Sequence, residues 1–488
     1  MRFPARRLPL ILSCVLALTA LAAFLPSLQN GFVALDDDGL VYENQDVLQP
    51  SLPAIVRVWT SYDAQKLYKP LTMMTYQVDV LLGGAGPVQF HLTNILLHAL
   101  CVVLAFALLR RLLGGLWMAF ALSLLFCLHP IQVETVAWIS SRKDLLSTAF
   151  LLGSALTWLY RRDTARGRFV SLMLFLCALL SKGSSLFFPL MLMLLDARDS
   201  RRFMTSLCQG LPMLILGAGF AAIGSLPYLG ERIGAGGMEA WFVTLRGITL
   251  TMRHLLYPSG LSALYPYPQL VLPAAFPYLS SGLLLLAVST VCLVMRKSVP
   301  DAGFGWLFFL CGLLPVLWNG ATLGLIVTAD RYAYLPLIGF FLALLMPLRA
   351  LWTRLSRGTP AWIPVLPALV MAAILFCLVY DRTAVWRDSI TLYTNILQNQ
   401  SNAWVARANL GVLLYRSGKA EAGAQQQRSA LAINPRFDTA YFNLGVIRMA
   451  QGRMRDARGA FRMAVSLNPS GLNRAGLRQA GGTDELQF

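Results

Sequence analysis

Three adjacent carboxylates, Asp36-Asp37-Asp38, follow the first long apolar segment of the chain. Adjacent carboxylates repel one another, so at least one of their pKa values should be raised, which suits a general base. Their oxygen atoms could also hold a divalent cation. A solvated acidic loop explains the motif equally well, so the motif alone leaves the catalytic and the structural interpretations open.

A second polar cluster runs from His129 to Asp144 and joins two apolar segments. Glu134 adds a carboxylate that could take part in catalysis, and Arg142 and Lys143 are cations that could neutralise a phosphate. The structural alternative is an ion pair between Glu134 and Arg142, with His129 capping a helix. Both interpretations place the cluster at one membrane face.

Two further cations lie at the ends of apolar segments. Lys182 stands between two short apolar runs, where a lysine is costly unless it has an anionic partner or its amine reaches the membrane surface. Arg331, in Asp330-Arg331-Tyr332, could bind phosphate or pair with Asp330. Tyr332 beside it is another candidate site residue.

The elements that must position these groups are apolar helices. Of the 488 residues, 57% are hydrophobic and 13% are charged, whereas soluble domains carry about 25% charged residues. A membrane span needs about 20 apolar residues. The sequence therefore predicts an all-α protein, a polytopic bundle of about eleven spans at residues 8–25, 91–109, 116–128, 145–160, 169–180, 186–195, 203–223, 283–295, 304–318, 332–348 and 363–380.

Basic residues between these segments predict the orientation. They cluster at Arg110-Arg111, Arg161-Arg162, Arg201-Arg202 and Arg296-Lys297, as in cytoplasmic loops. The net charge of +18 therefore indicates orientation in a membrane and argues against a nucleic-acid partner. The clusters share one side only if residues 241–257 lie on the membrane surface as an amphipathic helix. This predicts a cytoplasmic N-terminus and an extracytoplasmic C-terminus, with the candidate site residues on the extracytoplasmic side.

The C-terminal part carries a repeat. Asn409-Leu410-Gly411 recurs as Asn443-Leu444-Gly445, and Asn434-Pro435 recurs as Asn468-Pro469. The offset of 34 residues is the tetratricopeptide period. Two repeats are few for a stable array, so residues 384–400 are expected to add a flanking helix. The expected domains are a membrane domain over 1–383, with an outer loop at 26–90 and a short helix at 52–60, a repeat domain over 384–470, and a flexible tail over 471–488.

The ordered set of motifs resembles the transmembrane and tetratricopeptide-repeat O-mannosyltransferases and their bacterial relatives. It departs from them in three ways: Lys69 stands where Arg is usual, Gly183 stands where Pro is common, and the repeat array is short. The motifs that carry the resemblance are Asp36-Asp37-Asp38 with the following residues to Val47, Tyr68-Lys69-Pro70-Leu71-Thr72, the cluster from His129 to Asp144, Ser181-Lys182, the segment from Asp330 to Pro336, and Trp386-Arg387-Asp388.

The resemblance implies a GT-C glycosyltransferase with a polyprenyl-phosphate sugar as donor. Asp36 or Asp37 would accept the proton of an acceptor hydroxyl, such as Ser or Thr of an extracytoplasmic protein, as it attacks the anomeric carbon with inversion. The sugar would be a hexose such as mannose. No organic cofactor is expected, and transfer without metal is favoured, with a divalent cation at Asp36 and Asp37 as the alternative. The leaving lipid phosphate would be stabilised by Arg142, Lys143, Lys182 and Arg331.

Two other functions compete with this one. The first is a non-catalytic membrane scaffold that recruits a peptide partner through its repeats, and the second is a transporter of a lipid-linked sugar. A scaffold has no need of Asp36 and Asp37 beside phosphate-neutralising cations. A transporter is expected to have internally repeated spans with charges near the bilayer midplane. The arginine-rich composition and compact loops favour a bacterial inner membrane.

Overall fold

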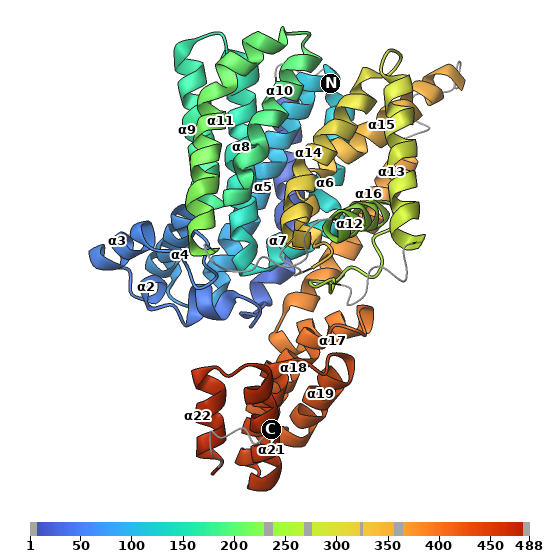
Figure 1. Cartoon of the computed structure of the whole chain (residues 1–488). Coiled ribbons are helices and arrows are strands. Elements are labelled where there is room, and N and C mark those ends of the chain that lie inside the picture. Colours follow the sequence, from blue (N-terminus) through green and yellow to red (C-terminus); the bar gives the residue numbers. More distant parts are fainter. Residues whose placement is uncertain (1–6, 229–237, 268–275, 323–325, 356–364, 482–488) are drawn as a thin grey trace. The chain divides into compact units, whose positions relative to one another are not determined.

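The computed structural model describes residues 7–228, 238–267, 276–322, 326–355 and 365–481 (Figure 1). Within these ranges the regular elements are helices, which confirms the predicted all-α class. Contacts divide the chain into two compact units. We call Met1–Leu261 with Tyr267–Arg387 the membrane unit, and Ser262–Pro266 with Asp388–Phe488 the repeat unit.

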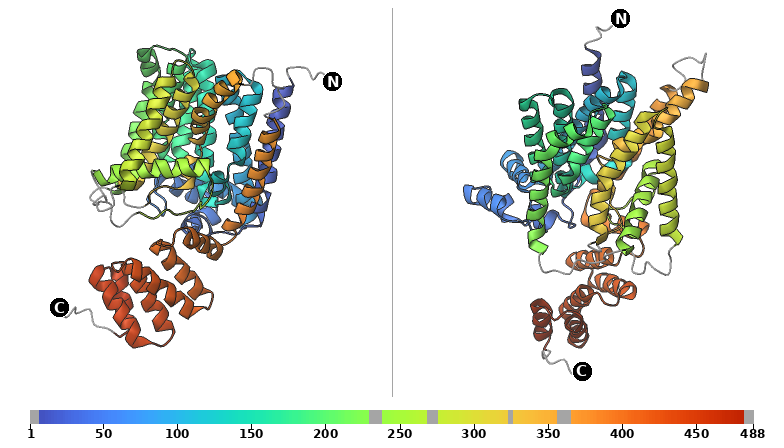
Figure 2. Two further views of the ribbon diagram at one scale, coloured as in Figure 1. Left: turned by 90° about the vertical axis from the view of Figure 1, so that its right-hand side faces the viewer. Right: turned by 45° about the horizontal axis from the view of Figure 1, so that its top comes forward.

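Apolar helices, most of them long, lie side by side in the membrane unit (Figures 1 and 2). Several carry exposed apolar side chains such as Leu286 and Val294, as helices facing lipid do. These helices are α1 (Leu8–Phe24), α5 (Pro87–Leu113), α6 (Leu116–Leu128), α8 (Arg142–Arg161), α9 (Ala165–Ser181), α10 (Phe188–Arg198), α11 (Phe203–Ser225), α13 (Phe276–Met295), α14 (Pro300–Thr322), α15 (Leu337–Leu355) and α16 (Val365–Thr383).

Six helices in the described ranges are long and apolar enough to cross a membrane, or seven if α6 and its bent continuation over Pro130–Ala137 form one span. The predicted number of eleven is therefore not confirmed. Several expected spans are short: α9 has 17 residues and α10 has 11. The first two residues of the expected span at 363–380 lie outside the described ranges. At 332–348 the helix starts only at Leu337, because Asp330–Ala333 forms a separate 3-10 turn.

Helix α12 (Met238–Leu256) has a different direction from its neighbours. Figure 1 shows it nearly end-on beside α13 and α14, and Figure 2 shows it running across the bundle. It carries Arg246 and Arg253 and is not among the helices apolar enough to span. These features support the predicted amphipathic helix at a membrane surface.

Short helices occupy much of the expected outer loop. The helix predicted at 52–60 is α3 (Leu52–Thr60), and the Ser51 hydroxyl caps it by accepting a hydrogen bond from the Ala54 amide at 3.3 Å. The loop also contains α2 (Gln45–Leu48) and α4 (Pro70–Gly83), which were not predicted. A core of buried side chains joins this region to the bundle and includes Leu40, Val41, Tyr76, Phe90 and Ile139.

Ion pairs join the helix ends that carry the arginine pairs. Arg162 pairs with Asp196 and, at 2.6 Å, with Asp199. Arg198 pairs with Asp301 at 2.6 Å, which ties α10 to α14. Helix α8 runs from the candidate site at Arg142 to this cluster, and its 20 residues span about 30 Å. The arginine cluster and the candidate site therefore lie at opposite ends of α8.

The repeat unit contains two helical hairpins in the 34-residue register, formed by α18 (Trp404–Arg416) with α19 (Ala420–Ile433) and by α20 (Asp438–Ala450) with α21 (Met454–Leu467). Gly411 allows the helices of the first hairpin to approach closely, since a Cβ there would lie 2.8 Å from the Gly423 carbonyl oxygen. The expected flanking helix is α17 (Ser389–Asn399). Part of the expected flexible tail instead forms α22 (Gly471–Gln479), because Leu477 packs into the core around Phe461. Residues 482–488 lie outside the described ranges.

Candidate active site

Asp37 is fixed by three hydrogen bonds. Ser140 donates to one carboxylate oxygen through its amide at 3.0 Å and its hydroxyl at 2.5 Å, and the Val33 amide donates to the other at 3.0 Å. Asp37 is 1% exposed. Burial raises its pKa to about 6, although the hydrogen bond from Ser140 opposes the shift. The carboxylate therefore anchors the chain after α1 to the short turn η4 (Ile139–Ser141).

Asp36 and Asp38 have different surroundings from Asp37. In the described part of the chain, the half-buried Asp36 carboxylate has no hydrogen bond or ion pair. It lies close enough to Lys143 to favour the charged amine electrostatically. Asp38 begins a π-helical turn, and its carbonyl accepts the Glu43 amide at 3.0 Å. Of the three carboxylates, Asp36 is the one with free lone pairs beside a cation.

Glu134 and Arg331 form a buried ion pair. Glu134 lies on the short helix α7 (Val133–Ala137) and Arg331 on the turn η8 (Asp330–Ala333). The alternative pairings considered from the sequence, Glu134 with Arg142 and Arg331 with Asp330, are therefore wrong. The Arg331 guanidinium also lies 5.2 Å from the ring centre of Trp138 and 5.1 Å from that of Tyr332, which favours a charged group there.

Asp330 holds the turn η8 from its other side. It pairs with Arg382 at 3.6 Å and lies 3.9 Å from the imidazole of His254. These contacts link η8 to α16 and α12. They leave the neighbouring Arg331 turned toward Glu134.

Lys182 has an anionic partner in Asp144, so its amine does not depend on reaching the membrane surface. Lys182 follows the last residue of α9, and Asp144 lies in the first turn of α8. The Thr72 hydroxyl donates to the Ser181 carbonyl at 2.9 Å and so ties this corner to α4. The Lys182 amine lies 6.0 Å from the ring centre of Tyr332.

Lys143 lies between the acidic loop and the other cations. Its amine donates to the Ser140 carbonyl at 3.3 Å and lies 5.3 Å from the ring centre of Trp138. Lys143 thus shares one indole ring with Arg331. Trp138 in turn stacks on Trp386, with ring centres 5.6 Å apart.

Arg142 is separated from these cations by its own buried network. It pairs with Asp79 at 2.5 Å and donates to the Asn94 side chain at 2.9 Å and the Phe90 carbonyl at 2.8 Å. Its guanidinium lies 4.5 Å from the ring centre of Tyr76, and the side chain is fully buried. The guanidinium of Arg142 is thus surrounded by protein groups. We therefore assign Arg142 a structural role, in which it links the start of α8 to the N-terminal part of α5.

His129 also has a structural position. One ring nitrogen accepts the Ile131 amide at 3.2 Å, which caps a short 3-10 turn, and the other contacts the Leu255 carbonyl at 3.1 Å. The side chain is buried. This arrangement matches the capping interpretation of His129.

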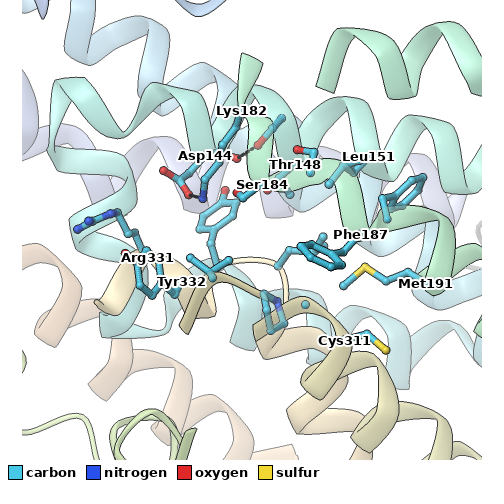
Figure 3. A pocket seen from close by; sticks show the side chains of 18 residues that line it. Asp144, Thr148, Leu151, Lys182, Ser184, Phe187, Met191, Cys311, Arg331 and Tyr332 are labelled. Carbon is cyan, nitrogen blue, oxygen red and sulfur yellow. Dashed lines mark hydrogen bonds and ion pairs between the residues drawn. The ribbon is translucent and has the colours of Figure 1, made fainter. Parts of the chain in front are cut away.

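A pocket with two chemically different ends opens beside these residues (Figure 3). Arg331, Lys182 and Asp144 lie at one end and Phe187, Met191 and Cys311 at the other. The walls come from α8, α10, α14, the turn η5 (Gly183–Phe187) with the preceding Lys182, and η8 with the residues that follow it to Pro336. Such a pocket suits a ligand with an anionic head and an apolar tail. Tyr332 lines the polar end. The other predicted site residues do not line the pocket: Arg142, Lys143, Glu134, His129 and the three aspartates.

The structure adds three residues that sequence reasoning did not assign to the site. Asp144 holds Lys182, Trp138 lies beside Arg331 and Lys143, and Ser140 holds Asp37. All three belong to the cluster from His129 to Asp144, so their closeness in sequence to predicted site residues could have indicated them. In the described part of the chain, no three or more His, Cys, Asp and Glu side chains are grouped as metal ligands.

The fold and the pocket define a helical membrane protein with a cation-lined site at one end of its bundle. No protein-family model matches the chain. The chain is, however, 24% identical to human protein O-mannosyl-transferase TMTC1 over 497 residues, covering 86% of this chain and 55% of that protein. A shorter match, 32% identical, is to human protein O-mannosyl-transferase TMTC3 and covers 28% of this chain and 16% of that protein. Another, 33% identical, is to mouse protein O-mannosyl-transferase TMTC4 and covers 29% of this chain and 22% of that protein.

These similarities confirm the resemblance found in the sequence motifs. The chain is similar to several curated proteins that carry the name protein O-mannosyl-transferase TMTC. It spans about half the length of the human TMTC1 protein that it matches.

Proposed function

We propose that this protein transfers a hexose, mannose being the first candidate, from a polyprenyl-phosphate donor to a hydroxyl group of a protein. The observation that carries the proposal is the pocket of Figure 3, whose polar end, with Arg331 and Lys182, continues into apolar walls. A polyprenyl-phosphate sugar combines a charged phosphate with an apolar tail. The similarity to protein O-mannosyl-transferases supports the same reaction class.

The carboxylate of Asp36 would be the general base. Its carboxylate has no hydrogen bond or ion pair in the described ranges, so its lone pairs are available, and it lies close enough to Lys143 to interact with the amine electrostatically. Asp37 would instead hold the loop in place through Ser140. The acceptor oxygen forms a bond to the anomeric carbon while its proton moves to Asp36. The bond from that carbon to the phosphate oxygen breaks, and its electron pair leaves with the lipid phosphate.

Arg331, Lys182 and Lys143 would bind the phosphate and stabilise the charge that develops on it. Arg331 and Lys182 line the pocket, and Lys143 lies on the same Trp138 ring as Arg331. Glu134 would position Arg331 and would not touch the reacting atoms. In a transfer without a metal ion, which stays our expectation, the amines and the guanidinium would provide the positive charge.

The acceptor would be a Ser or Thr side chain of an extracytoplasmic protein, presented by the repeat unit. The positive-inside pattern supports a cytoplasmic position for the arginine cluster at the end of α8 and an extracytoplasmic position for the site at its start. The membrane unit also ends at the site: the Asn30 amide donates to the Thr383 carbonyl at 3.0 Å, and Trp386 stacks on Trp138. A bacterial inner membrane remains our expectation for the location.

The test is transfer from a polyprenyl-phosphate hexose by the purified full chain in lipid nanodiscs, with mass spectrometry of a Ser- and Thr-containing acceptor. We expect activity in the wild-type protein and none in Asp36→Asn. Asp38→Asn is the matched control, since it removes the same charge two positions away and should keep activity. Full activity of Asp36→Asn would contradict the assignment of the base. A wild-type protein that binds the donor without transferring sugar would favour the scaffold or transporter.

A further inference from the structure

Lys143 differs from the other cations of the site in having no carboxylate partner. Lys182 pairs with Asp144, Arg331 with Glu134, and Lys69 with Asp63. The amine of Lys143 donates only to the Ser140 carbonyl, at 3.3 Å, among the described residues. Its side chain is 9% exposed. A protonated amine in this position has a positive charge that neither water nor a counter-ion fully balances.

The charged groups around Lys143 act in opposite directions. Asp36 and Asp144 favour the charged amine, whereas Lys69 and Arg331 disfavour it. Burial is the largest influence and lowers the pKa of Lys143 to about 7. These groups come from the loop after α1, from α8 itself, from the start of α4 and from η8. The two cations and the burial together outweigh the carboxylates.

We propose that the amine of Lys143 takes up a proton when the phosphodiester of the donor binds, and then acts as a cation that binds it. The inference rests on the proposed function, since the donor provides the anion. In the empty site a large fraction of Lys143 is neutral. The bound phosphodiester supplies the missing negative charge, and the amine becomes fully protonated beside it.

The charges of the site support this assignment. The pairs of Lys182 with Asp144 and of Arg331 with Glu134 are each neutral overall. They can orient a phosphate by hydrogen bonds but contribute no net positive charge. A phosphodiester carries one negative charge, and a protonated Lys143 matches it with one positive charge. The structure thereby gives Lys143 a role that its paired neighbours cannot fill.

Proton uptake can be measured by titration calorimetry, because the binding enthalpy then depends on the ionisation enthalpy of the buffer. The probe is a short-chain polyprenyl phosphate esterified to mannose, which has no titratable proton near neutral pH. The protein is the full chain in nanodiscs. At pH 7 we expect uptake of about half a proton per bound donor, given a pKa of about 7 in the empty site.

The pH profile distinguishes Lys143 from Asp37, whose raised pKa is about 6. At pH 6 Lys143 is already mostly protonated and can take up only about 0.1 proton, and its uptake increases toward pH 8. Asp37 could take up as much as about half a proton at pH 6. The donor affinity should weaken above pH 7, by up to about tenfold per pH unit. Lys143→Arg keeps a cation that does not titrate, so it should bind the donor without proton uptake.

Binding without buffer dependence would overturn the inference and leave the proposed function intact. Uptake of about half a proton at pH 6, or uptake that persists in Lys143→Arg, would also overturn it. If Lys143→Arg does not fold, the wild-type profile alone decides between the two residues. A wild-type protein that fails to bind the probe at any pH would instead contradict the proposed function.

Discussion

Ser140 donates two hydrogen bonds to Asp37, from its amide and from its hydroxyl, across 103 positions of sequence. This contact joins the acidic loop after α1 to the polar cluster before α8. It also distinguishes the two adjacent aspartates: the Asp37 carboxylate accepts hydrogen bonds from its partners, whereas the Asp36 carboxylate has no hydrogen bond or ion pair among the described residues.

Asp36→Asn and Asp37→Asn should therefore fail in different ways. Asp36→Asn should lower transfer by about 100- to 10,000-fold with little change in stability, because only the base is lost. Asp37→Asn should lower stability by about 1–3 kcal/mol, because an amide cannot accept all three hydrogen bonds. Transfer rates and thermal unfolding of the two variants test this difference. Equal loss of stability in both would contradict it.

The free energy of unfolding should show a pH-dependent step that arises from ionisation of Asp37. Its pKa is raised from 3.8 to about 6 in the folded protein, so the folded state binds the proton more tightly than the unfolded state. This contribution, about 3 kcal/mol, is complete below about pH 4 and is lost as the pH rises through about 6. Ser140→Ala removes a hydrogen bond that lowers this pKa, so the step should move to higher pH. Unfolding midpoints measured across pH 4 to 8 would show it, and a shift to lower pH would contradict the assignment.

Substitution of Arg142 and of Lys182 should affect different properties, stability in one case and donor binding in the other, although the sequence predicted both cations at the phosphate. Arg142→Gln leaves Asp79 buried without its partner and should cost about 3–5 kcal/mol of stability. Lys182→Gln changes a residue that lines the pocket and should mainly weaken donor binding. Donor affinity and unfolding are measured for each variant. A folded Arg142→Gln protein with weakened donor binding would return Arg142 to the site.

Glu134 and Arg331 should be coupled in stability. Either single change, Glu134→Gln or Arg331→Gln, leaves a buried charge unpaired and should be strongly destabilising, by about 3–5 kcal/mol. The double variant should lose less than the sum of the two, because neither charge is then left alone. A double-mutant cycle of denaturant unfolding measures this coupling. Additive losses would show that the pair is not formed.

Two glycines of the repeat unit should respond differently to alanine. A Cβ at Gly445 would lie 2.8 Å from the Phe461 ring, whereas a Cβ at Gly459 has no atom within 4 Å. Gly445→Ala should therefore destabilise the second hairpin, and Gly459→Ala, inside α21, should stabilise it by about 1 kcal/mol. Limited proteolysis of the full chain compares the two. Equal protection would contradict the close packing at Gly445.

The sequence by itself determined the features that depend on local pattern. Apolar segments predicted the helical class, the 34-residue period predicted the hairpins, and the run at 52–60 predicted α3. The motif order also identified the related family. The helical segments can be predicted because hydrophobic periodicity acts within a few residues. The repeat and the motif order can be read from the order of residues along the chain without knowing which residues meet in space.

The tertiary structure decided which charges meet. Arg331 pairs with Glu134, 197 positions away, and not with its neighbour Asp330. Arg142 and Lys143 are adjacent in sequence, yet helix packing directs one to Asp79 and leaves the other near Asp36. A buried ion pair forms where desolvation makes an unpaired charge costly, and only the packed helices determine which partner lies within reach.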